Sequence, residues 1–163
     1  MVHIRLFSIF LSLFFCVSAG GVEIQNQINV AGSPCRHSPT SFECVDFIEN
    51  YDGDTIKVNI PRVHHFFGNE TPIRIQGIDT PEIISDSSCE RDLAAKAAMV
   101  TENLLRKAKR IDLRNVKRGK YFRVVADVYI NHNKNLGKEL LKRRLAVESS
   151  RHGSGSVNWC RLP

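Results

Sequence analysis

Apolar and polar residues alternate in three short segments after residue 40, and this pattern predicts three β-strands. The segments are "FECVDFI" (42–48), "TIKVNI" (55–60) and "IRIQGI" (73–78). The Asp52-Gly53 pair predicts a tight turn between the first two strands. A longer loop separates the second strand from the third. The folded part of the chain is therefore expected to begin with three strands.

After Pro81 the spacing of the apolar residues changes from that of a strand to that of a helix. Ser87 and Glu90 have the spacing of a capping box, which marks a helix start. Apolar residues follow at helical intervals as far as Lys109, at Leu93, Ala97, Val100, Leu104 and Ala108. The sequence predicts one helix over this stretch.

Strand patterns resume at 111–116 and 122–130, and Asn135 stands where it can cap a second helix that runs to Leu145. Three strands, a helix, two strands and a helix predict an α+β domain. Five short strands with two to three helices fit a five-stranded β-barrel of the OB type. We expect this domain to span residues 41–150.

The N-terminal residues have the layout of a secretory signal peptide. Residues 1–5 carry one positive charge, residues 6–17 form an apolar run, and small residues follow at 17–19. An uncleaved anchor is the alternative, but the run is shorter than the ~20 residues that span a bilayer. The sequence predicts a signal peptide over 1–19, an irregular arm over 20–40, and a secreted or periplasmic protein without stable membrane association after cleavage.

Four cysteines remain after the signal peptide: Cys35, Cys44, Cys89 and Cys160. An even number in an exported chain predicts two disulfides, and three connectivities are possible. Pairing of Cys35 with Cys44 would leave Cys89 to tether the C-terminal tail, residues 151–163. A zinc site is the alternative, although the chain has no C-x-x-C pair.

Basic residues outnumber acidic ones by six, and the excess lies in the second half of the chain, as in "LLRKAKRIDLRNVKRGKYFR" (104–123). Such a distribution favours a polyanionic partner, with nucleic acid first. A solvated basic surface without a partner is the alternative.

Charged residues gather where the predicted strands begin or end. An arginine inside a strand, Arg74, needs an anionic partner, and a structural ion pair is the simplest one. However, four carboxylates surround it in sequence: Asp52, Asp54, Asp79 and Glu82. Clustered carboxylates repel one another unless a cation lies among them, and a set of hard oxygen ligands favours Ca²⁺ or Mg²⁺. The residues therefore suggest metal-assisted hydrolysis of a phosphodiester.

Four motifs in order carry a family resemblance: "DGDT" (52–55), "IRIQGIDTPE" (73–82), "KYFRVVADVY" (120–129) and "LLKRRLA" (140–146). Together they resemble the staphylococcal nuclease (thermonuclease) family, over residues 42–147. The resemblance implies an OB barrel with helices.

The resemblance also implies a metal site. Asp54 and Asp79 would bind the cation through their carboxylates, and Thr80 through its backbone carbonyl. Asp52 would lie behind these ligands and orient water. The usual metal of the family is Ca²⁺, and Mg²⁺ or another divalent cation could replace it.

The same resemblance implies the remaining roles. Glu82 would act as the general base. Arg74 and Arg123 would hold the scissile phosphate, and Lys120 and Tyr121 would contact a neighbouring phosphate. At position 144 the family often has the glycine that closes its second helix, where this chain has Arg144.

The resemblance implies a monomeric endonuclease that cleaves DNA and RNA with little sequence specificity, favours single-stranded or frayed regions, and leaves 3′-phosphate ends. Two alternatives stand beside it. One is a noncatalytic OB module that binds nucleic acid, and the other is a disulfide-linked secreted factor whose carboxylates only store Ca²⁺. Retention of every carboxylate and arginine of the implied site favours the enzyme.

Overall fold

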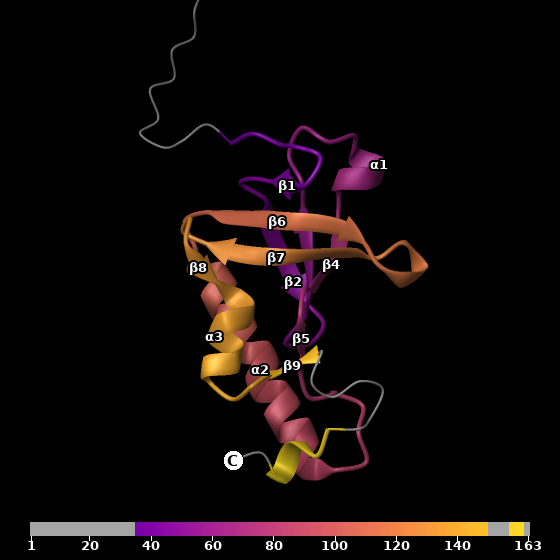
Figure 1. Ribbon diagram of the computed structural model, residues 1–163, viewed down its shortest axis with the longest axis vertical. Coiled ribbons are helices and arrows are strands. Elements are labelled where there is room, and N and C mark those ends of the chain that lie inside the picture. Colours follow the sequence, from indigo (N-terminus) through magenta and orange to yellow (C-terminus); the bar gives the residue numbers. More distant parts are fainter. Residues whose placement is uncertain (1–34, 150–156, 162–163) are drawn as a thin grey trace, which may run out of the picture. The chain divides into compact units, whose positions relative to one another are not determined.

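The computed structural model describes residues 35–149 and 157–161. The expected signal peptide and most of the expected arm and tail lie outside these residues. The strands of the main sheet run in the order β1-β6-β7-β4-β3-β2, with β8 paired to β7 (Figure 1). Their bounds are β1 Ser41–Phe42, β2 Asp46–Asn50, β3 Thr55–Asn59, β4 Thr71–Ile75, β6 Ile111–Arg118, β7 Val124–Ile130 and β8 Lys134–Asn135. Only β4 and β7 are parallel among these pairs of the described chain.

The stretch that contains β1 and β2 links the two ends of this strand order. Its first part, β1, pairs with β6, and its second part, β2, pairs with β3. Cys44, with a φ of 53°, interrupts the strand between them, and the Val45 N–H donates to the Ile111 carbonyl at 2.9 Å. The N-terminal strand therefore bridges both edges, as in an OB-like fold, and the predicted α+β class is confirmed.

Three helices and two 3-10 turns complete the described part: α1 His65–Gly68, α2 Ser88–Arg106, α3 Leu136–Lys142, η1 Lys120–Phe122 and η2 Trp159–Arg161. The helices α2 and α3 lie together at one end of the sheet (Figure 1). A second, two-stranded sheet, β5 (Ile78–Asp79) with β9 (Val147–Glu148), lies at the same end. None of the described helices is long and apolar enough to span a bilayer.

Alternating strand residues build the core, as the sequence predicts. Ile56 and Val58 of β3 and Ile73 and Ile75 of β4 are almost completely buried. Leu140 of α3 is fully buried as well. Truncation of one such side chain to alanine costs about 2–5 kcal/mol, so this core fixes the strand ends on which the charged residues lie.

Several element boundaries differ from the predicted ones. The helix α2 ends at Arg106 rather than at Lys109, and β7 begins at Val124 rather than at 122. The later start of β7 follows from Tyr121, whose φ of 56° places a turn before the strand. The strand predicted over 73–78 breaks at Gly77, where φ is +78°.

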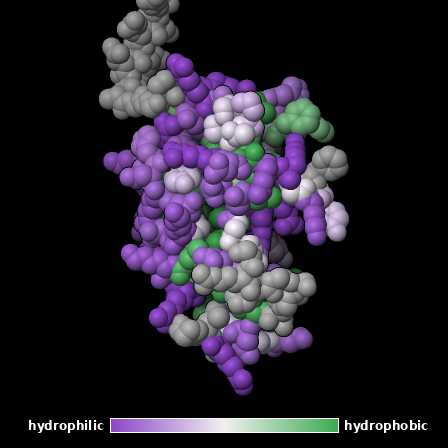
Figure 2. Space-filling model, viewed as in Figure 1, coloured by the Kyte–Doolittle hydropathy of each residue, from purple (hydrophilic) through white to green (hydrophobic). Residues whose placement is uncertain are grey.

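The helix α1 is absent from the prediction, because "HHFF" has no cap signal strong enough to mark a single turn. Its Phe66 and Phe67 are 77% and 64% exposed. Figure 2 shows hydrophobic atoms gathered over this part of an otherwise largely hydrophilic face.

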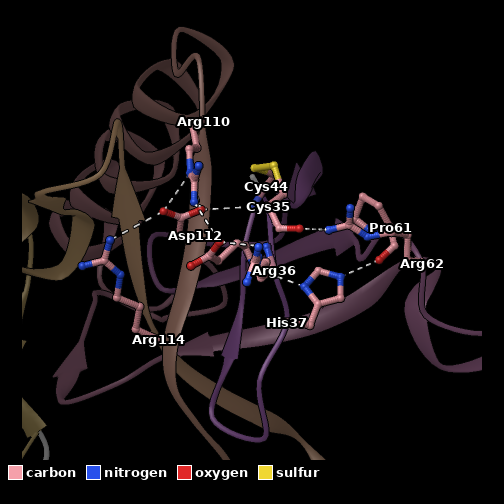
Figure 3. The surroundings of a disulfide bond; sticks show 10 residues. Cys35, Arg36, His37, Cys44, Pro61, Arg62, Arg110, Asp112 and Arg114 are labelled. Atoms are coloured by element: carbon pink, nitrogen blue, oxygen red, sulfur yellow. Dashed lines mark hydrogen bonds and ion pairs between the residues drawn. A yellow bond between two sulfur atoms is a disulfide. The ribbon is translucent and has the colours of Figure 1, made fainter. Parts of the chain in front are cut away.

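Two disulfides form, Cys35–Cys44 and Cys89–Cys160, with Cα–Cα distances of 5.6 and 6.1 Å. This pairing resolves the open connectivity and replaces the zinc alternative. Around the first disulfide, the Cys44 N–H donates to the buried carboxylate of Asp112, which also pairs with Arg110 (Figure 3). Two disulfides indicate an oxidising environment.

Candidate active site

The candidate site begins with the turn over residues 51–55, called the Asp52 turn below. The Asp52 Oδ1 atom accepts hydrogen bonds from the backbone N–H groups of Asp54 and Thr55, at 2.9 and 2.6 Å. The Tyr51 N–H donates to the Thr55 carbonyl at 3.0 Å, which closes the turn. Asp52 therefore shapes the turn through its own side chain, as Asx turns do, and places Asp54 at the start of β3.

Helix α2 holds this turn from behind. The Thr101 hydroxyl, fully buried, donates to the Gly53 carbonyl at 2.7 Å. The Asn50 amide donates to the carbonyls of Asp52 and Ala98, at 2.9 and 3.1 Å. A Cβ atom at Gly53 would lie 2.8 Å from the Ala97 Cβ atom. The glycine is therefore required by this close approach to the helix, and its φ is not in the left-handed region.

Asp54, Arg74 and Asp79 meet at the end of β4. The Asp54 carboxylate, 1% exposed, forms an ion pair with the Arg74 guanidinium. The same guanidinium contacts Asp79 Oδ1 at 2.5 Å and donates to the Ile78 carbonyl at 3.3 Å. The Thr80 N–H donates to Asp54 Oδ2 at 2.9 Å. The structure thus brings the two expected metal ligands and the expected phosphate-binding arginine to one point.

Asp52 lies behind Asp54, Arg74 and Asp79, and burial is the main influence on its pKa. Desolvation raises the pKa of Asp52 above its usual value, and the hydrogen bonds from Thr55 oppose that rise. The positive charges of Arg74 and Arg123 also lower this pKa. Asp52 is only 8% exposed. Burial is therefore the main influence on the Asp52 carboxyl, and its pKa is raised on balance.

Glu82 lies farther out than the other carboxylates. It is exposed, and its backbone N–H donates to Glu90 Oε1 at 3.2 Å. Within the described residues, the Glu82 carboxylate has no hydrogen-bond or ion-pair partner. The Ser87 hydroxyl caps α2 as predicted, whereas Glu90 turns to Glu82 and Ser85 instead of completing the capping box. The start of α2 therefore fixes the backbone of Glu82 and leaves its carboxylate open to solvent.

The other positively charged side chains of the expected site, Lys120 and Arg123, lie in the turn before β7. Arg123, Lys120 and Tyr121 are exposed, Tyr121 by 94%. The Gly119 N–H donates to the Arg123 carbonyl at 2.8 Å, which closes η1 at its base. In the part of the chain that the structure describes, no acidic side chain pairs with Lys120 or Arg123. Both cations are thus available to an anionic ligand.

The residues at this point fit a hard divalent cation. Asp54 and Asp79 supply carboxylate oxygens that converge on one cationic group, and Thr80 is adjacent. Asp52 does not join them, because its carboxylate is turned to the amides of its own turn. Across the described residues, no group of three or more His, Cys, Asp or Glu side chains forms a metal cluster. The donor set is therefore the two carboxylates, with a backbone carbonyl as the expected third oxygen.

A family model described as "Staphylococcal nuclease homologue" matches residues 72–157, more than half of the 163 residues. The chain belongs to the staphylococcal nuclease family. The match includes Arg74, Asp79, Glu82 and Arg123, whereas the Asp52 turn precedes it. Members of this family are generally nucleases that act on nucleic acids, and they typically depend on a divalent cation. No curated protein sequence matches the chain.

The sequence prediction missed the two residues that anchor the site to α2. Thr101 carries a signal in retrospect, because a polar residue within the apolar stripe of a helix needs a buried partner. The signal at Asn50 is weaker, since an asparagine shortly before an Asp-Gly pair indicates only a turn. Both contacts join segments about fifty residues apart, which local patterns do not encode.

Proposed function

We propose that this chain is a secreted, metal-dependent endonuclease that hydrolyses phosphodiester bonds of DNA and RNA with little sequence specificity. The observation that carries the proposal is the convergence of Asp54 and Asp79 on the Arg74 guanidinium. Arg123 comes two residues before Val125, the β7 partner of Arg74, and no acidic side chain of the described residues pairs with it. If Arg74 served only in a structural ion pair, one carboxylate would be enough to balance its charge. Two carboxylates around one arginine, with a second arginine on the neighbouring strand that no carboxylate occupies, are a set for a cation and a phosphate.

In the proposed reaction the arginines bind and orient the phosphate. A guanidinium has five N–H donors, and Arg74 directs its two terminal nitrogens to Asp54, Asp79 and the Ile78 carbonyl. The rest of its donors and the whole of Arg123 can hold phosphate oxygens. Their positive charge stabilises the negative charge that develops around phosphorus. A bound divalent cation, Ca²⁺ in this proposal, would add positive charge and ease the ionisation of water.

Glu82 is proposed to accept the proton of the attacking water. As the water oxygen bonds to phosphorus, its proton passes to the Glu82 carboxylate, and the bond from phosphorus to the 5′ oxygen breaks. The leaving oxygen takes a proton from solvent, and the upstream product keeps a 3′-phosphate. The open carboxylate of Glu82, without a competing partner in the described structure, supports this role.

The substrate is proposed to be single-stranded or frayed nucleic acid, bound by a monomer. Tyr121, 94% exposed beside Lys120 and Arg123, offers a ring on which a base can stack next to the phosphate contacts. Two disulfides favour an extracytoplasmic location. Cleavage of a signal peptide at 1–19 belongs to the same proposal.

The test is a cleavage assay on purified protein with single-stranded DNA, double-stranded DNA and RNA, in Ca²⁺ or in chelator. We expect Ca²⁺-dependent cleavage, and a loss of about 10²–10⁴-fold in rate for Glu82→Gln. Glu102→Gln is the matched control, because Glu102 lies on α2 and its ion pair within the described residues is with Arg106, on the surface. No Ca²⁺-dependent cleavage by the wild type would refute the enzyme, and binding without cleavage would favour the noncatalytic OB module. Equal rates for both variants would refute the role of Glu82.

A further inference from the structure

A pocket of about 320 Å³ lies on the main sheet next to the candidate active site and is used by none of the roles above. It is called the Tyr51 pocket below. Its walls come from the end of β2 with Tyr51, the residue that follows, from β3, and from Pro72 of β4. Thr55, the first residue of β3, belongs both to these walls and to the Asp52 turn. The pocket therefore adjoins the turn that places Asp54.

The sheet register puts this pocket on the same face as Arg74. Ile56 of β3 and Ile73 of β4 are buried in the core, so the residues next to them in each strand lie on the outer face. Thr55 is the cross-strand partner of Arg74, and the Tyr51 N–H donates to the Thr55 carbonyl at 3.0 Å. Tyr51, Thr55 and Arg74 thus form one row across the sheet. The first and last of them are two strand spacings apart, roughly 10 Å.

The pocket and the η1 turn flank Arg74 on opposite sides. In the strand order β7-β4-β3-β2, the strand β4 lies between β7 and β3. Arg123 comes two residues before Val125, the β7 partner of Arg74. The pocket lies instead toward β3 and the end of β2. A nucleic-acid strand that crosses the sheet with one phosphate on Arg74 can therefore reach the η1 turn on one side and the pocket on the other.

Two exposed rings give the pocket an apolar surface that a ligand can reach. Tyr51 is 64% exposed, and Pro72 on the opposite wall is exposed as well. An exposed tyrosine offers a large, flat face for contact with another ring, and its hydroxyl can stay in water. Such a surface fits a flat, uncharged group better than a charged one.

The polar side chains of the walls already have partners, which argues against a phosphate in this pocket. The Lys57 ammonium contacts the Glu49 carboxylate at 2.6 Å, so the two charges compensate each other. The Thr55 hydroxyl donates to Asp54 Oδ1 at 3.3 Å. The Asn50 amide donates to two backbone carbonyls, at 2.9 and 3.1 Å. Because the cationic side chain of these walls is paired, the pocket favours the uncharged part of a nucleotide.

We infer that the Tyr51 pocket binds the base of the nucleotide next to the phosphate on Arg74, on the side away from the η1 turn, and that this base stacks on the Tyr51 ring. The inference rests on the proposed function, because the phosphate on Arg74 sets the reach of the strand. The volume lies at the lower end of the roughly 300–1,000 Å³ of ligand pockets, which suits one base with its sugar. Every base has a π face, so the pocket should accept all bases alike.

The test measures the binding of single-stranded oligomers by fluorescence anisotropy in Ca²⁺, with the Glu82→Gln protein, which is not expected to cleave them. Oligomers of thymidine and of deoxyadenosine are compared with an abasic oligomer of the same length. Tyr51→Thr removes the ring and keeps a residue suited to a strand end. We expect it to weaken the binding of both base-containing oligomers by about fivefold or more, the value of one stacked base, and to leave the abasic oligomer unaffected. Tyr51→Phe keeps the ring and should bind all three as the parent does.

Phe66 provides the matched control, and salt provides a second readout. Phe66 is 77% exposed, but it lies on α1, at the opposite end of β4 from the site. Phe66→Thr should therefore bind every oligomer as the parent does. Tyr51→Thr should leave the salt dependence of binding unchanged, whereas Lys120→Gln should reduce it, because only a phosphate contact releases counterions. Circular dichroism of each variant checks that the fold is kept.

The outcomes separate this inference from the proposed function. Ca²⁺-dependent cleavage by the wild type, with no loss of affinity in Tyr51→Thr, would overturn the base pocket and leave the nuclease standing. An equal loss for base-containing and abasic oligomers would overturn the pocket as well, because the ring would then act without a base. A loss confined to one of the two bases would overturn the claim that all bases are accepted alike. A loss that requires bases, in a protein whose wild type does not cleave, would support the pocket and overturn the nuclease.

Discussion

Replacing Thr101 with valine tests whether α2 positions the Asp52 turn. The substitution keeps the shape of a fully buried side chain and removes the hydroxyl that donates to the Gly53 carbonyl at 2.7 Å. That carbonyl would then be buried without its donor, which costs about 1–3 kcal/mol of unfolding free energy. The turn should also relax away from the helix, and the Asp54 carboxylate, one residue further on, should move with it.

The functional effect is expected to exceed the effect of stability alone. A displacement of about 1 Å at a catalytic group can cost about 10²-fold in rate, so we expect kcat/KM to fall by tenfold or more for Thr101→Val. Thr101→Ser restores the hydroxyl and should recover most of this loss. Urea unfolding gives the change in stability, and cleavage of a fluorescent oligonucleotide in Ca²⁺ gives kcat/KM.

Thr71 provides the matched control for this experiment. It is 8% exposed, and its hydroxyl donates to the Phe67 carbonyl at 2.7 Å, at the opposite end of β4 from the site. Thr71→Val should lose a similar unfolding free energy and keep full activity. Equal kinetic losses in Thr71→Val and Thr101→Val would refute the positioning role of α2, because both would then act through stability alone. Full activity in Thr101→Val would refute it directly.

Two further predictions concern strained or buried groups. Arg144 has a φ of 58° at the end of α3, where the Leu145 and Arg144 N–H groups close a Schellman motif on Leu140 and Leu141. Arg144→Gly should therefore raise the unfolding free energy by about 0.5–1 kcal/mol in urea titrations, and an unchanged or lower midpoint would contradict this. Burial raises the pKa of Asp52 in the folded state, so its charged form destabilises the fold at neutral pH, and this cost disappears as the pH falls through that pKa. Asp52→Asn should then be the more stable protein at about pH 7, with an advantage that shrinks at about pH 4, whereas a constant or growing advantage would refute the sign.

The strands and long helix could be predicted because their signals are local. Alternation marks the strands of the sheet, and Ser87 and Asn135 cap their helices as the sequence indicates. What escaped prediction depends on contacts between distant segments. The one-turn helix α1 forms where the Ile60 N–H reaches the Gly68 carbonyl at 2.7 Å. This hydrogen bond between the two ends of the segment stabilises α1. Four residues are too few to show a helical period in the sequence, so the helix could not be predicted.

The features of the candidate site also divide into those that could be predicted from the sequence and those that could not. Asp54, Arg74 and Asp79 were expected to meet, and they do, because strand ends that pair in the sheet bring them together. Asp52 was expected to lie behind the metal ligands and orient water; its Oδ1 atom accepts hydrogen bonds from the amides of its own turn, and its role toward water stays a prediction. The amide contacts of Asp52 are local, so an Asp-Gly pair can indicate them in the sequence, whereas the contact that holds the turn against α2 joins distant segments.

Helix α2 therefore sets the spacing between the proposed metal ligands and the proposed base. In its last third, Thr101 fixes the Gly53 carbonyl before Asp54, and near its start, Glu90 fixes the backbone N–H of Glu82. These two residues lie on the same helix, so α2 links the turn that carries Asp54 to the segment that carries Glu82. Cys89, beside Glu90, ties the same helix start to the C-terminal segment through Cys160. The distance from Asp54 to Glu82 is thus controlled by one helix and one disulfide, although neither contributes an atom to the proposed reaction.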